Sequence, residues 1–197
     1  MKPINTYLFC LLVIMISSCV KKTETVTQET DAKELAEDRN DEKFENTSLK
    51  DDSEFALKAA EGGLMEVKLG ELAQTQASSP EVKKFAQQMI TDHSKANTEL
   101  QQLAREKNIS IPTSLGEDKQ KKYDDFASKK GEEFDRAYSD FMVKDHKEDV
   151  DLFQKEADNG GDPELKAWAA KTVPVLKHHL QMAEDAEKAV KANKRNQ

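Results

Sequence analysis

Apolar residues recur at alternating spacings of three and four through most of the chain after Ser53. This spacing is typical of helices that bury one face, and no stretch shows the period of two expected of a strand. The clearest example runs from Ser79 to Arg105, where Ser79 suits the helix N-cap and Pro80 the first helical position. Its apolar positions are Val82, Phe85, Ala86, Met89, Ile90, Ala96, Leu100, Leu103 and Ala104. The pattern predicts an all-α protein.

A second stretch, beginning at Asp162, repeats this one. Pro163 corresponds to Pro80, and Trp168 corresponds to Phe85. Each copy follows another amphipathic stretch, at residues 53–77 and 132–158, which indicates one helical hairpin used twice. Two antiparallel hairpins joined by a long crossover close most simply into a four-helix bundle. A loop as long as this crossover is seldom without structure, and we expect a short helix at residues 117–129.

The N-terminal residues indicate export. Residues 7–16 are an apolar run too short to span a bilayer, and small residues precede Cys19. We therefore predict a lipoprotein signal peptide at residues 1–18 and lipidation of Cys19. Ordinary signal cleavage next to an incidental cysteine is the alternative.

The remaining boundaries follow from composition. Residues 20–52 are rich in Thr, Glu, Asp and Lys, with few apolar residues to offset the entropy of the chain. We predict a lipidated cysteine and disordered acidic tether at residues 19–52, a helical domain at 53–190 and a C-terminal tail at 191–197. The net charge of −8 argues against nucleic acid as a partner.

Four ionisable residues lie near the middle of the four predicted long helices, on their apolar faces. They are Glu66, His93, His146 and His179. In antiparallel helices of similar length, mid-helix positions meet at a similar height, so we expect these side chains to converge.

Two interpretations of this cluster stay open. The histidines can be core residues that fix the register of the helices through hydrogen bonds. Alternatively, they bind one divalent transition-metal ion, for which imidazole is a suitable ligand, with His178, Asp145 and Asp149 as additional ligands. A di-iron site is not expected, because that site needs two Glu-x-x-His motifs and no glutamate lies three residues before any histidine here.

The helices also carry a resemblance to a known family. Residues 55–73 (FALKAAEGGLMEVKLGELA), 134–150 (FDRAYSDFMVKDHKEDV) and 176–183 (LKHHLQMA), together with the stretch from Ser78 to Asn97, resemble the bacterial domain-of-unknown-function family number 4142. The resemblance implies a ferritin-like fold and an exported protein of the kind often labelled an outer-membrane protein. It implies no agreed activity.

The sequence favours a lipid-anchored envelope protein whose helical domain is a binding or interaction module. There is no glycine-rich phosphate loop, no G-x-S-x-G motif, and no cysteine after Cys19, so catalysis is not indicated. We expect the anchor to hold it at a membrane facing the periplasm, with an envelope protein as partner. A metal-binding or metal-handling protein of the periplasm, using the His and Glu cluster, is the alternative.

Overall fold

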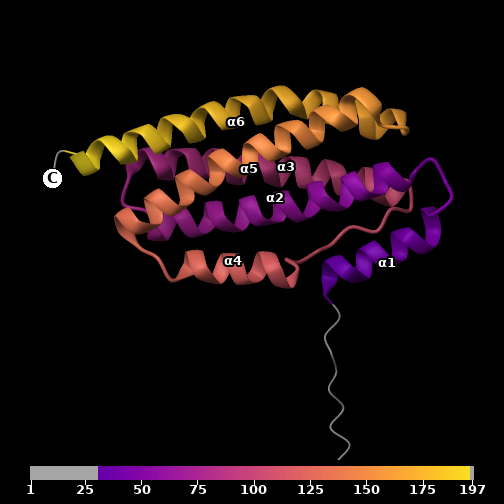
Figure 1. The fold of residues 1–197 in the computed structure, drawn as a ribbon, viewed down its shortest axis with the longest axis horizontal. Coiled ribbons are helices and arrows are strands. Elements are labelled where there is room, and N and C mark those ends of the chain that lie inside the picture. The colour runs from indigo at the N-terminus through magenta and orange to yellow at the C-terminus, as the bar shows by residue number, and fades with distance from the viewer. Residues whose placement is uncertain (1–30, 196–197) are drawn as a thin grey trace, which may run out of the picture.

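The computed structural model describes residues 31–195, and this part of the chain folds into six helices without a strand (Figure 1). The helices are α1 (Ala32–Phe44), α2 (Lys50–Gln76), α3 (Pro80–Glu106), α4 (Glu117–Ala127), α5 (Gly131–Asn159) and α6 (Pro163–Arg195). The all-α prediction is thereby confirmed for the described residues. The expected signal peptide, Cys19 and the start of the expected tether lie outside them. No helix in the described part has the length and apolar character needed to cross a membrane.

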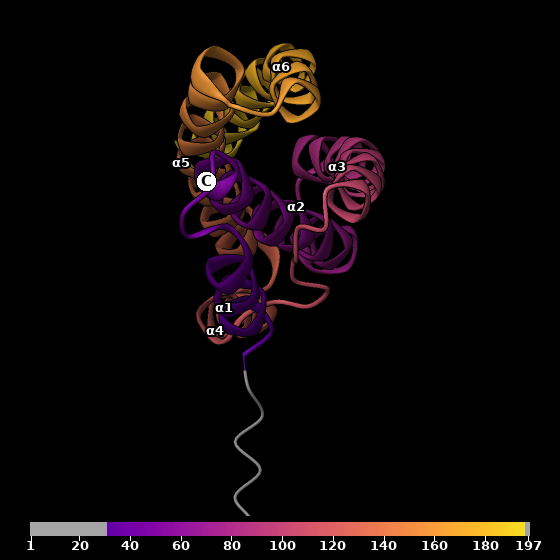
Figure 2. The same cartoon turned by 90° about the vertical axis from the view of Figure 1, so that its right-hand side faces the viewer.

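Two helical hairpins make up most of the structure. Three residues join α2 to α3 and three join α5 to α6, so the helices of each pair run antiparallel. Helix α5 packs along α2 and α6 packs along α3, which places the hairpins side by side (Figures 1 and 2). The crossover between the hairpins carries the expected short helix, α4, which lies against α2 and α5.

Local chemistry sets the helix ends. Ser79 caps α3 by accepting a hydrogen bond from the Val82 amide at 3.3 Å, with proline as the first helical residue. Asp162 caps α6 by accepting from the amides of Glu164 and Leu165 at 3.0 and 2.9 Å. Helix α5 ends before Gly160, where a Cβ atom would lie 2.5 Å from a carboxylate oxygen of the preceding turn.

The ordered part of the chain is larger than the sequence indicated. Residues 32–44, which we placed in the tether, form α1, and α1 packs against α2. Ala36, Asn40 and Phe44 recur every four residues and are buried on one face of α1. The Asn40 side chain donates to the Ser110 carbonyl at 2.8 Å and accepts from the Ser110 amide at 2.7 Å. This pair holds α1 to the crossover despite its few apolar residues.

Both ends of the predicted domain also shift. Helix α2 begins at Lys50, three residues before the expected start of the domain. Helix α6 continues to Arg195, five residues past the expected end at residue 190.

Two buried aspartates tie each hairpin to the turn of the other. Asp135 of α5 accepts hydrogen bonds from the amides of Ser78 and Ser79, at 3.1 and 2.9 Å, and from the Ser78 hydroxyl. Asp52 of α2 accepts from the amides of Gly161 and Asp162 at 2.8 and 2.9 Å. Each carboxylate thus satisfies backbone donors in a turn that lies far away in the sequence. The contacts are reciprocal, as expected of a duplicated hairpin.

The buried apolar side chains form two clusters along the long helices. One cluster contains Met65, Leu69, Ala73, Val82, Phe85, Met89, Phe134, Tyr138, Met142, Ala183, Ala186 and Val190, among others. The other contains Phe55, Ala56, Ala59, Ala60, Leu100, Ala104, Phe153, Leu165, Trp168, Val173 and Leu176, among others. On each long helix one ionisable residue lies where the first cluster meets the second. These residues are Glu66, His93, His146 and His179.

Candidate metal centre

The structure brings the four predicted residues together in one buried layer. Glu66 projects from α2, His93 from α3, His146 from α5 and His179 from α6. His146 has no exposed surface, and the other three side chains belong to residues no more than 7% exposed. The ring centroids of the histidines lie 5.7 Å apart for His93 and His146, 5.2 Å for His93 and His179, and 5.5 Å for His146 and His179.

One nitrogen of each imidazole is held by an oxygen atom. His93 Nδ1 lies 2.7 Å from Glu66 Oε2. His146 Nδ1 lies 3.1 Å from the main-chain carbonyl of Met142, one turn earlier on α5. His179 Nε2 lies 2.8 Å from Oδ2 of Asp92, which comes from the neighbouring helix α3. Such contacts fix the tautomer and the orientation of an imidazole, as they do for histidines that bind metals.

The second nitrogen of each imidazole has no hydrogen-bond partner. His93 Nε2, His146 Nε2 and His179 Nδ1 are all buried and unsatisfied. One ligand atom from each of the three residues lies within 4.8 Å of the corresponding atoms of the other two. Buried polar atoms are nearly always satisfied in proteins, so three unsatisfied nitrogens on three neighbouring imidazoles need an explanation. Three imidazoles with a free nitrogen each are the kind of ligand that transition-metal ions take.

The electrostatic environment keeps these imidazoles neutral. Burial lowers the pKa of His146 to about 3, and the positive charges that His93 and His179 can carry act in the same direction. Burial also lowers the pKa of His179 to about 4, against the opposing effect of Asp92. Burial lowers the pKa of His93 as well. Neutral imidazole is the form that binds a metal, so all three ligands are available near pH 7.

Carboxylates extend the layer on the side of α2 and α5. Glu66 Oε1 lies 3.4 Å from His146 Nε2, without a hydrogen bond between them. Glu66, His146 and the partly buried Asp149 also place one ligand atom each within 4.8 Å of one another. Burial raises the pKa of Glu66 well above its usual value, and the charge of Asp145 adds to the effect. Burial also raises the pKa of Asp149 well above its usual value, and the charges of Glu66 and Asp145 add smaller effects in the same direction.

The other residues named from the sequence have different positions. His178 is exposed on α6, with its ring 6.4 Å from that of His179, and it does not join either group of potential ligands among the described residues. His178, named from the sequence as an additional ligand, lies away from the buried layer, because adjacent residues on a helix point about 100° apart. Asp145 lies near the carboxylates but belongs to neither group. Sequence reasoning gave Asp92 no part in orienting a ligand, although that residue holds His179.

A small cavity adjoins the layer. Its volume is about 20 Å³, enough for one water molecule, and its walls include Gly63, Glu66, His93, Asn97 and Asp149. A Cβ atom on Gly63 would lie 2.1 Å from Asn97 Oδ1, so the absent side chain lets α3 approach α2 here.

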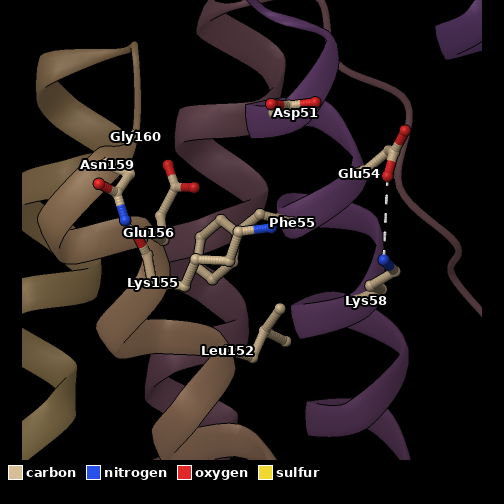
Figure 3. A pocket seen from close by; sticks show the side chains of 9 residues that line it. All are labelled: Asp51, Glu54, Phe55, Lys58, Leu152, Lys155, Glu156, Asn159 and Gly160. Carbon is tan, nitrogen blue, oxygen red and sulfur yellow. Dashed lines mark hydrogen bonds and ion pairs between the residues drawn. The ribbon is translucent and has the colours of Figure 1, made fainter.

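A larger cavity lies at the far end of the hairpins, away from the histidines. Its volume is about 90 Å³, and Figure 3 shows the side chains of α2 and α5 that line it. One of them, Glu156, has a buried carboxylate oxygen without a hydrogen-bond partner. Burial and a hydrogen bond with Asp52 raise the pKa of Glu156 to about 7. No metal-ligand group among the described residues includes it.

Glu156 makes the stability of the protein depend on pH. Its pKa rises from 4.5 to about 7 on folding, so the folded state holds a proton that the unfolded state has lost between these values. Stability is therefore lost as the pH rises through 7. We expect Glu156→Gln to be about 1–3 kcal/mol more stable than wild type at pH 8 and nearly equal to it at pH 4, below the unfolded-state pKa, measured by urea unfolding. Glu54→Gln, an exposed change in the same cavity, is the control. Equal effects at both pH values would contradict this account.

Comparison with known proteins adds a family and a structural neighbour. The family model described as Domain of unknown function (DUF4142) matches residues 26–186. No curated protein matches the chain. Among solved structures, one titled CopM in the Cu(I)-bound form is similar over 70% of this chain and 96% of its own, with a TM-score of 0.59 and 19% identity. At this identity the likeness concerns the fold alone.

Proposed function

The chain belongs to the DUF4142 family, whose description assigns no function, and we propose that its helical domain binds one transition-metal ion through His93, His146 and His179. The observation that carries the proposal is the set of three buried imidazole nitrogens without partners, each on a ring whose other nitrogen is held by an oxygen. A structural polar layer would need those atoms satisfied, because an unsatisfied buried polar atom costs about 1–3 kcal/mol. Metal binding is therefore favoured over the structural interpretation.

Copper is the first metal to test. Imidazole suits copper, zinc, nickel and iron, so copper is among the ions that three imidazoles can bind. The solved structure with a similar fold is titled as a Cu(I)-bound form, which supports copper as the choice.

The two side-by-side hairpins support our classification of the domain as a ferritin-like four-helix bundle. The ligand set has no pair of Glu-x-x-His motifs, so di-iron chemistry is not part of the proposal.

The cellular setting of the proposal comes from the sequence. The apolar run and the small residues before Cys19 support export and lipid anchoring at the cell envelope, with the domain facing the periplasm. A metal-binding domain in that setting would buffer or hand on metal ions. An envelope protein that exchanges the ion is the partner that this function requires.

Metal content is the most direct test. Protein purified without a histidine tag is expected to retain about one transition-metal ion per chain, measured by elemental analysis. Adding Cu(I) or Zn²⁺ to the metal-free protein should raise its melting temperature by about 5–10 °C at a hundredfold excess over the dissociation constant, because the ion binds only the native state. Metal-free protein whose melting temperature does not respond to either ion would overturn the proposal.

A further inference from the structure

Two groups of potential ligands meet at His146. The first is the three-histidine group, and the second consists of Glu66, His146 and Asp149. We propose that one ion occupies either of two overlapping positions, a nitrogen position at the three histidines and an oxygen-rich position at Glu66, His146 and Asp149 that takes Mn²⁺. The inference rests on the proposed function, because it concerns the same metal centre.

His146 makes the two positions mutually exclusive. Its Nδ1 is committed to the Met142 carbonyl, so only Nε2 can bind an ion. The same nitrogen lies 3.4 Å from Glu66 Oε1, and His146 is also a member of the group formed with His93 and His179. One lone pair serves one ion, so the domain holds one metal at a time.

Glu66 is arranged to serve both positions. Its Oε2 lies against His93 Nδ1 and orients that imidazole, while its Oε1 is buried and has no partner. Oε1 is therefore placed to bind an ion, next to Asp149, with which the Glu66 carboxyl group also hydrogen-bonds. Residues three apart share a face of a helix, so Asp149 presents its carboxylate on the same side of α5 as His146.

Space for the ion exists on this side of the layer. The cavity of about 20 Å³ adjoins the oxygen-rich group: its walls include Glu66, Asp149, Asn97 and His93, while His146 does not line it. The cavity is large enough for one water molecule, which would complete the coordination of an ion.

The two positions select different ions. Carboxylate, carbonyl and water oxygens suit Mn²⁺, whereas imidazole suits zinc and copper. Two carboxylates and one imidazole therefore favour Mn²⁺ over Cu(I), and three imidazoles favour the reverse. The identity of the bound ion would then decide whether Asp149 or the pair His93 and His179 completes the ligand set.

Mn²⁺ and Zn²⁺ are the probes for this inference, with wild-type, Asp149→Asn and His179→Gln proteins. Glutamine at 179 places an amide nitrogen near the position of imidazole Nε2, which keeps the contact with Asp92 and removes Nδ1. Free Mn²⁺ is measured from its room-temperature electron paramagnetic resonance signal, and Zn²⁺ affinity by competition with a chelator.

We expect Asp149→Asn to weaken Mn²⁺ binding at least about tenfold and to change Zn²⁺ affinity little, while His179→Gln does the reverse. Zn²⁺ should displace Mn²⁺ from the wild type, with about one ion bound in total. Asp151→Asn, an exposed change on the same helix, should alter neither.

Three results would overturn the inference. These are simultaneous binding of both ions, equal losses for both ions in both variants, and the absence of Mn²⁺ binding. If Zn²⁺ still binds in those cases, the proposed function stands and only the second position fails. If neither ion binds, the proposed function fails with it.

Discussion

Replacing His146 with asparagine is expected to abolish metal binding while leaving the metal-free protein close to wild type in stability. The asparagine amide can donate to the Met142 carbonyl in place of His146 Nδ1, whereas the unpartnered Nε2 has no counterpart. His146 belongs to both groups of potential ligands, so its loss should reduce the affinity for any bound ion by about 100-fold or more. Elemental analysis and the rise in melting temperature with Cu(I) measure the effect.

The matched control is His178→Asn. The two substitutions remove the same chemical group, but His178 is exposed and lies outside both groups of potential ligands. Its variant should retain the metal and the full rise in melting temperature. The structural interpretation predicts a different pattern, in which His146→Asn lowers the stability of the protein by about 1–3 kcal/mol whether or not metal is present. That pattern would contradict a metal centre.

The meeting of the four side chains could be predicted from the sequence, because it depends on the length of each helix and on which of its faces is apolar. Glu66, His93, His146 and His179 each lie about halfway along a helix and on its apolar face, and short turns force neighbouring helices antiparallel. These constraints are local in the sequence, so they set the height of each side chain without a structure.

Which residues and which nitrogen atoms form the site depends on how each helix is rotated about its axis and on contacts between helices. The sequence could not establish whether His178 or His179 faces the core, because that depends on how α6 is rotated about its own axis against its neighbours. Nor could it show that Asp92 reaches across from α3 to His179, or which nitrogen of each ring stays free. Asp92 and His179, for example, lie 87 residues apart in the sequence, so their contact leaves no local pattern.

The same limit explains the part of the fold that was missed. Helix α1 has too few apolar residues to indicate burial, and its attachment depends on Asn40 meeting Ser110, 70 residues later. The reciprocal aspartates likewise act over separations of 56 to 110 residues. A single polar residue that recognises a distant turn leaves no periodic pattern, although it can stabilise the fold as much as an apolar contact does.

Removing the Asp135 carboxylate is therefore expected to be strongly destabilising. Asp135→Ala leaves the amides of Ser78 and Ser79 buried or partly buried without their acceptor. Each unsatisfied donor costs about 1–3 kcal/mol, so we expect a loss of about 3–5 kcal/mol in the free energy of unfolding, measured with urea. This is a large part of the 5–15 kcal/mol that is usual for a domain. Glu133→Ala, an exposed change in the first turn of the same helix, should cost less than about 0.5 kcal/mol.

Asp52→Ala tests whether the two aspartates act equivalently at opposite ends of the structure. Asp52 accepts from two backbone amides and also hydrogen-bonds with Glu156, so its loss should cost about 2–4 kcal/mol. Because the two turns share no partner, the effects should add in the double variant to within about 0.5 kcal/mol. A cost below about 1 kcal/mol for Asp135→Ala would show that water satisfies the turn. A strong departure from additivity would show that the two hairpins dock through a contact that both aspartates influence.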